Sequence, residues 1–196
     1  ASTLLADAGY RRNGSLVKNA QGEPLRLEML VNDEVFVRID TPFIENLKAI
    51  GIDASITLVD PAQYQARQST FDFDMVSSAS SFTASPARDE LAGLFHSSSA
   101  ALNGSRNLPG TSDPAIDRLI AIAAAASTRA DLTIALKVLD RVLRARRDWI
   151  PNWHAANHRT AYWDMFGFAE PKPDYGFPVE TLWWLDKQKA DAIGKG

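Results

Sequence analysis

The sequence predicts an α/β fold in which a mainly parallel sheet is flanked by helices. Three short stretches, 25–31, 54–58 and 71–78, alternate apolar and polar side chains as half-buried β-strands do. Helical patterns separate them, from about 34 to 50 and from 61 to about 68. Strands that alternate with helices in this way usually lie parallel in one sheet, so the order indicates a βαβ arrangement.

The first long helix carries its own ending signal. Its apolar stripe consists of Phe43, Leu47 and Ile50. Gly51 followed by Ile52 predicts a Schellman ending, because glycine adopts the left-handed conformation that this ending needs. Pro42 lies inside the pattern, so the helix either kinks there or begins near Thr41.

Two more helices are predicted in the second half of the chain. Asp113 and Pro114 have the side chains typical of a helix cap and a first helical residue. Thr128 with Asp131 three residues later resembles a capping box, and it predicts the start of a helix over about 129–147. The leucine stripe of that helix predicts that it packs on the sheet.

Composition excludes several classes of protein. The 196 residues are 45% hydrophobic and 23% charged, which is typical of a globular domain. The net charge of -3 argues against a nucleic-acid partner, and the absence of cysteine excludes disulfides, cysteine-ligated zinc and thiol catalysis. The chain begins at Ala1 and shows no signal peptide, so we expect a fragment or a processed product.

Two groups of residues could carry chemistry, and neither has the setting that chemistry needs. His154 and His158 have a zinc-binding spacing only if they lie on a helix, which Pro151 argues against. Asp72 and Asp74 would share one face of a strand and could do acid–base work. A hydrolase acting through His154 with Asp72 or Asp74 is the enzymatic alternative, but no activated nucleophile accompanies them. We therefore expect no catalysis, no cofactor and no metal.

A ligand-contact segment is predicted directly after the third strand. It consists of Ser77, Ser78, Ala79, Ser80, Ser81 and Phe82. The small side chains let another backbone approach, so an extended peptide could pair here as an added strand. Ligands of open α/β sheets also bind beyond the carboxyl ends of the strands. The alternative is a flexible serine-rich loop.

Further ligand contacts are predicted in two later places. Arg106 could hold a ligand carboxylate as a bidentate fork, and Asn107 beside it could reach the same cleft. Trp153 and His154 are candidates for the wall of the binding site.

Several segments, taken in order, resemble the later half of the family-5 extracellular solute-binding proteins, which take up peptides and related solutes. The segments are LLADAGY, NLKAIGIDASITLVDPAQY, FDFDMVSS, SRNLPGTSDPAIDRLI, ALKVLDRVL and IPNWHAANHRTAYWDMFG. The match runs from Leu4 to Trp184, and the stretch over 104–167 is most similar to the Yej-type oligopeptide-binding branch. Single pieces are short, and their order and spacing make the resemblance specific.

The resemblance implies a two-lobed periplasmic protein that closes on an oligopeptide or modified peptide and delivers it to the permease subunits of an ABC importer. Residues 1–162 would form the second lobe, with the type II periplasmic-binding-protein fold. Residues 163–196 would return to the missing first lobe, whose N-terminal part is expected to carry the signal peptide. The aromatic tail over 165–185 is then expected to be poorly anchored alone.

One position departs from the family pattern. In better-known oligopeptide-binding members, an Asp four residues before a proline holds the amino terminus of the ligand. Phe82, four residues before Pro86, stands there in this chain, which favours a modified or unusual peptide. Haem, a nickel complex or a sugar stay open as ligands, because a shared fold does not fix the ligand. A sensor or interaction protein that has lost transport is a further alternative.

Overall fold

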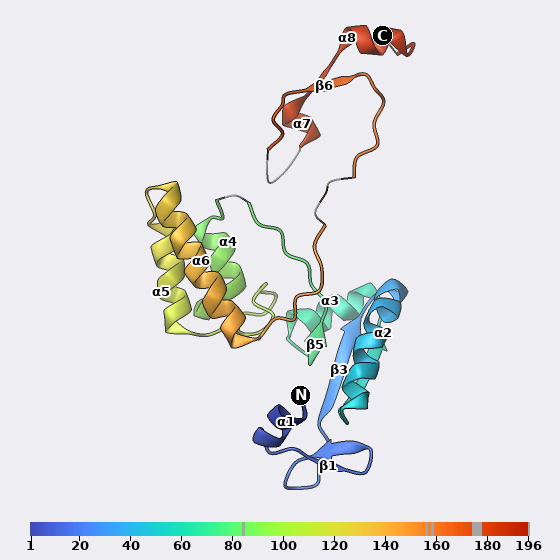
Figure 1. Cartoon of the computed structure of the whole chain (residues 1–196), viewed down its shortest axis with the longest axis vertical. Coiled ribbons are helices and arrows are strands. Elements are labelled where there is room, and N and C mark those ends of the chain that lie inside the picture. The colour runs from blue at the N-terminus through green and yellow to red at the C-terminus, as the bar shows by residue number, and fades with distance from the viewer. Residues whose placement is uncertain (84, 156, 158, 174–177, 196) are drawn as a thin grey trace. The chain divides into compact units, whose positions relative to one another are not determined.

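The structure is a computed structural model that describes residues 1–83, 85–155, 157, 159–173 and 178–195 (Figure 1). The chain forms two compact units. The first comprises Ala1–Ser81 and Ala87–Arg146, and the second comprises Phe82–Pro86 and Arg147–Gly196. This boundary between contact units lies earlier in the chain than residue 162, and the division into lobes stays a prediction.

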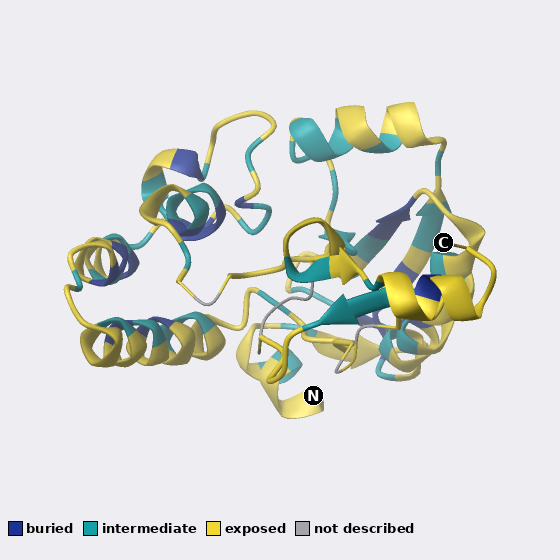
Figure 2. Ribbon diagram, turned by 90° about the horizontal axis from the view of Figure 1, so that it is seen from above, coloured by how far each residue is buried: buried dark blue, intermediate teal, exposed yellow. Residues whose placement is uncertain are grey.

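A three-stranded parallel sheet organises the first half of the first unit. Its central strand β3 (Arg26–Val31) pairs along its whole length with β4 (Asp53–Leu58). On its other side β3 pairs with β5 (Met75–Val76), so the strand order is β4-β3-β5. The end of β3 is buried at Met29, Leu30 and Val31, as is typical of a strand in a parallel sheet (Figure 2). The predicted parallel α/β sheet is confirmed.

The third strand is shorter than the predicted stretch over 71–78. It follows α3 (Pro61–Ser69), and the backbone N–H of Asp72 donates to the carbonyl of Arg67 at 2.9 Å. Phe71, between the helix and Asp72, has a φ of 57°. These first residues therefore end the helix in a left-handed turn, which leaves Met75 and Val76 to pair with β3.

Helix α2 (Glu34–Ala49) lies along the sheet (Figure 1). It begins at Glu34 and continues through Pro42, with Asp33 as its cap. Its Schellman ending is confirmed, since Ile52 donates to the carbonyl of Leu47 at 3.1 Å and Gly51 has a φ of 94°. Ile44 and Ile52 then join Val17, Met29, Val31 and Ala54 in one apolar core.

The N-terminal residues form a helix and a hairpin beside this core. Helix α1 (Ser2–Asp7) precedes the antiparallel strands β1 (Arg11–Asn13) and β2 (Leu16–Lys18). The N–H of Val17 in β2 donates to the carbonyl of Gly51 at 2.7 Å, which ties the hairpin to the end of α2.

A helical layer forms the rest of the first unit. It contains α4 (Arg88–Phe95), the 3₁₀ turn η1 (Ser97–Ser99), α5 (Pro114–Ala124) and α6 (Arg129–Arg146). Helix α6 packs against α5, and α5 packs against α4. The buried apolar residues of these helices are Leu91, Leu94, Phe95, Ile116, Ile120, Ala123, Ala135 and Leu139.

The prediction that the helix over 129–147 packs on the sheet is wrong. A leucine stripe predicts a buried face and does not say which element covers it. A short connection joins α5 to α6, so the two helices pack against each other as a local helical hairpin.

The second unit has less regular structure. Strand β6 (Phe166–Phe168) pairs antiparallel with β7 (Trp183–Leu185), which follows α7 (Val179–Leu182) and precedes α8 (Lys187–Ala192). The ring of Trp183 contacts those of Tyr162, Phe166 and Phe168, and its centroid lies 4.7 Å from that of Tyr162. Tyr175 and Phe177 lie outside the described residues, and the anchoring of the tail stays a prediction. None of the helices among the described residues combines the length and the apolar character that a membrane span requires.

Candidate functional site

The predicted ligand-contact segment begins where β5 ends. Ser77 is half-buried, whereas the described residues from Ser78 to Phe82 are exposed. In the described part of the chain β5 is an edge strand, because β3 covers only one of its sides. The segment therefore leaves the carboxyl end of an edge strand, where an extended peptide could add to the sheet.

Ser77 is held by side chains from two helices. Tyr64 on α3 donates its hydroxyl to the Ser77 carbonyl at 3.0 Å. The Ser77 hydroxyl donates to Oδ2 of Asp40 on α2 at 3.3 Å. The backbone and the side chain of Ser77 are thus both anchored at the start of the exposed segment.

Asp40 is a buried carboxylate at this end of the sheet, only 5% exposed. Burial raises the pKa of Asp40 above its ordinary value, and the hydrogen bond from Ser77 offsets part of that rise. Burial also raises the pKa of Tyr64, which keeps its hydroxyl protonated as a donor. Sequence reasoning missed both residues. The available signal was the position of Asp40 in the apolar stripe of α2, one turn before Ile44.

Arg106 and Asn107 have different surroundings. Arg106 is exposed, and its contact with a ligand carboxylate stays a prediction. Asn107 is fully buried, and its amide donates to the carbonyl of Thr111 at 2.9 Å while its oxygen accepts from the Thr111 N–H at 2.8 Å. The Asn107 side chain therefore braces the loop before α5, and its contact with a ligand stays a prediction.

Trp153 and His154 are exposed residues of the second unit, and Trp153 is 66% exposed. Their contact with a ligand stays a prediction. His158 lies outside the described residues. Among the residues that the structure describes, no group of three histidine, aspartate or glutamate side chains could hold a metal ion.

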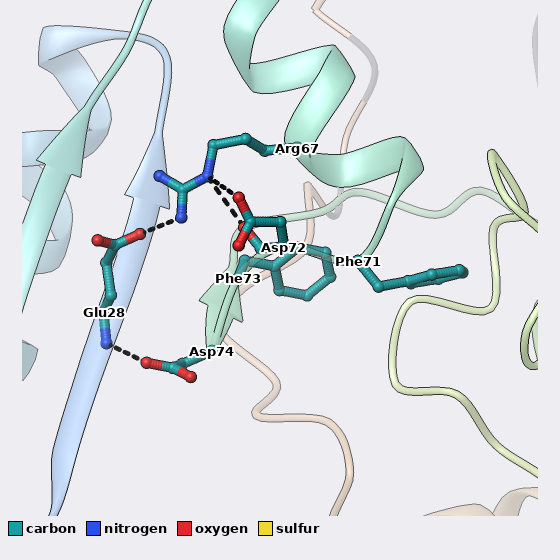
Figure 3. Close-up of a pocket in the computed structure, with 6 residues that line it drawn as sticks. All are labelled: Glu28, Arg67, Phe71, Asp72, Phe73 and Asp74. Atoms are coloured by element: carbon teal, nitrogen blue, oxygen red, sulfur yellow. Dashed lines mark hydrogen bonds and ion pairs between the residues drawn. The ribbon is translucent and has the colours of Figure 1, made fainter.

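A shallow depression lies at the opposite, amino-terminal end of β5 (Figure 3). Arg67 lies between two carboxylates, with its Nη2 2.5 Å from Oε1 of Glu28 and its Nε 3.0 Å from Oδ2 of Asp72. Asp74 accepts a hydrogen bond from the backbone N–H of Glu28 at 2.8 Å. Phe71 and Phe73 complete the lining.

This arrangement bears on the enzymatic alternative. Asp72 is engaged in an ion pair, and Asp74 caps a backbone N–H of the central strand. The two carboxylates therefore stabilise the turn between α3 and β5 and do not form a free pair for acid–base chemistry.

The chain is similar over almost its whole length to bacterial binding proteins. It is 35% identical to the probable peptide-binding protein YejA of Agrobacterium fabrum, over 95% of this chain and 30% of that protein. It is 31% identical to the peptidoglycan-binding protein YepA of the same bacterium, over 92% of this chain and 29% of that protein. The chain thus spans about three tenths of the length of these relatives. No protein-family model matches it.

Solved structures share the fold. A mannohexaose-bound periplasmic oligopeptide-binding protein of Thermotoga maritima superposes with a TM-score of 0.66 and 17% identity, over 76% of this chain and 29% of that one. The oligopeptide-binding protein AppA of Bacillus subtilis, in complex with a nonapeptide, gives a TM-score of 0.64 and 20% identity, over 75% of this chain and 29% of that one. The predicted fold, that of a type II periplasmic binding protein, is confirmed.

Proposed function

We propose that this chain, which is a relative of the Yej-type extracellular solute-binding proteins, forms part of the solute-binding subunit of an ABC importer. The subunit would capture an oligopeptide or modified peptide and deliver it to permease subunits. The names of the relatives describe binding proteins, and the engaged carboxylates Asp72 and Asp74 favour binding over hydrolysis.

One observation supports a particular segment as the ligand-binding site. An exposed run of small residues, Ser78 to Ser81, leaves the carboxyl end of the edge strand β5, with Ser77 anchored behind it. Main-chain pairing with such an edge gives affinity with little side-chain selectivity, which suits a transporter of mixed peptides. Phe82 and Arg106 would contact the ligand beside this segment, and Trp153 and His154 would form part of the wall.

The relatives are more than three times as long as the matched region, which supports a larger two-lobed protein. Residues 1–162 would belong to the second lobe and residues 163–196 would pack on the first lobe. A signal peptide ahead of that first lobe would direct the protein to the periplasm.

A peptide derived from the cell wall is a second candidate ligand. It is favoured by the similarity to YepA, whose name describes binding of peptidoglycan, the cell-wall polymer from which such peptides come. Peptides of this origin carry unusual amino acids and linkages. Phe82 stands where the family resemblance places an aspartate for a ligand amino group, and a modified peptide would need that aspartate less.

The test uses the full-length protein. Native mass spectrometry of the purified protein should show a peptide-sized adduct, and calorimetry should show binding of a pentapeptide of alanine or of a murein tripeptide. Ser80→Pro should lower peptide affinity by about 10-fold or more, because proline removes a backbone donor and adds bulk. Ser80→Ala keeps that donor and is the matched control, with an expected change below about 2-fold. Equal affinities of the two folded variants would place the peptide elsewhere.

A further inference from the structure

The polar contacts at the end of β5 form a continuous path between two helices. Nε2 of Gln68 lies 3.5 Å from the hydroxyl oxygen of Tyr64, and both residues belong to α3. Tyr64 donates to the Ser77 carbonyl, and the Ser77 hydroxyl donates to Asp40 on α2. Ser77 is therefore the point at which α2 and α3 hold the same residue.

Asp40 occupies a position where an apolar side chain would be the simpler choice. It shares a helical stripe with Val37, Ile44 and Leu47, all of which pack in or against the core of the sheet. A carboxylate is costly to bury, and its cost is reduced only by the groups that donate to it. Here the donor is the Ser77 hydroxyl, so the contact links a buried charge to the first residue of the candidate site.

We propose that Asp40 and Tyr64 are positioning residues for peptide binding, which fix Ser77 so that the backbone from Ser78 onward is presented as an edge for the ligand. This inference rests on the proposed function, because it assigns these residues to the same binding segment. Neither residue touches the ligand itself. They act by reducing the backbone freedom that the segment would otherwise lose when the peptide binds.

The geometry gives each anchor a separate task. The Tyr64 hydroxyl holds the carbonyl of Ser77 and so fixes the peptide plane that leads into Ser78. The Asp40 carboxylate accepts the hydrogen bond from the Ser77 hydroxyl and so fixes the orientation of the Ser77 side chain. Because β5 pairs with β3 through Met75 and Val76, removal of either anchor should leave that pairing intact and free only the residues from Ser77 onward.

The test measures binding of the alanine pentapeptide to full-length variants by calorimetry. Asp40→Ala, Ser77→Ala and Tyr64→Phe should each lower affinity by about 3- to 10-fold, as expected for the loss of one ordering hydrogen bond. The Asp40→Ala/Ser77→Ala double variant should be no weaker than the weaker single variant, because both changes remove the same contact. Asp40→Asn keeps an accepting oxygen and should recover most of the affinity.

A matched control separates positioning from general stability. Asp113→Ala removes the side-chain cap of α5, at 2.8 Å from the N–H of Ala115, and should lower thermal stability without changing peptide affinity. Amide exchange over 78–81 in the ligand-free protein should be faster in Asp40→Ala and unchanged in Asp113→Ala. If Asp40→Ala does not fold, Tyr64→Phe and Ser77→Ala decide the matter.

Each outcome has a definite meaning. If the wild type binds the peptide and the folded Tyr64→Phe and Ser77→Ala variants bind it with the same affinity, the positioning role is overturned and the proposed function stands. A wild-type protein that binds neither the alanine pentapeptide nor the murein tripeptide overturns both.

Discussion

The two ends of β5 differ in how they use polar groups. At the amino end, Glu28, Arg67 and Asp72 form an ionic cluster whose members satisfy one another around a visible depression. At the carboxyl end, Asp40 and Tyr64 are turned inward onto Ser77, and the residues beyond are exposed and small. A depression lined by charges that are already paired has little left to offer a ligand. An anchored edge strand followed by exposed, small residues is the better candidate for a binding surface.

The largest expected effect is a loss of stability from a change in β3, the strand that pairs with β5. Leu30, the next-to-last residue of β3, is fully buried, and Leu30→Ala should lower the free energy of unfolding by about 2–5 kcal/mol through the cavity that it leaves. Denaturant unfolding measures this loss. Peptide affinity of the folded fraction should change little, because neither anchor of Ser77 is removed. A smaller loss than that of Ile122→Ala, at a half-exposed position of α5, would contradict the central place of β3.

A moderate effect is expected at the amino end. Asp74→Ala removes the acceptor of the Glu28 N–H and should lower the free energy of unfolding by about 1–2 kcal/mol. Asp74→Asn keeps an acceptor and should lose less. Both variants should bind the alanine pentapeptide as the wild type does. A selective loss of affinity with intact stability would move the binding site to the amino end and break the comparison.

The smallest effect is a pH dependence at the carboxyl end. Because burial raises the pKa of Asp40 above its ordinary value of 3.8, its contribution to stability is fully present below pH 3.8 and is lost as the pH rises through the folded pKa. Asp40→Asn does not titrate, so its stability relative to the wild type should increase between pH 4 and pH 7. Urea unfolding at several pH values measures the difference. A relative stability that is flat or falls with pH would contradict the raised pKa.

Ser77→Ala sharpens the same measurement. The hydrogen bond from Ser77 lowers the pKa of Asp40, so its removal should move the pH window of the effect upward. An unmoved window would show that Ser77 is not the donor that Asp40 uses in solution.

The sequence predicted the features that depend on neighbours in the chain. Gly51 ends α2 and Asp113 caps α5, because both signals act on backbone groups within a few residues. The parallel order of the strands also followed from local periodicity. Helix α6 was assigned to the wrong partner because an apolar stripe carries no information about the element that covers it.

Only part of the candidate site was predicted, because local patterns do not show which distant residues contact it. Its exposed segment stood out as a run of small residues after a strand. Its anchors come from α2 and α3, and Asp40 lies 37 residues from Ser77 in the sequence. Asn107 shows a second limit of local patterns, since a polar residue in a polar loop gave no sign that it would be buried among its own loop carbonyls.

The pairing of α5 with α6 has a consequence for the order of folding. The two helices are joined by a short connection, so their contacts close small loops, whereas the β3–β4 pairing must first close a loop that contains all of α2. Contacts between residues that are near in sequence form faster, since less chain entropy is lost before they are made. We therefore expect the helical hairpin to form before the sheet during refolding, and the edge strand β5 to be among the last features to appear.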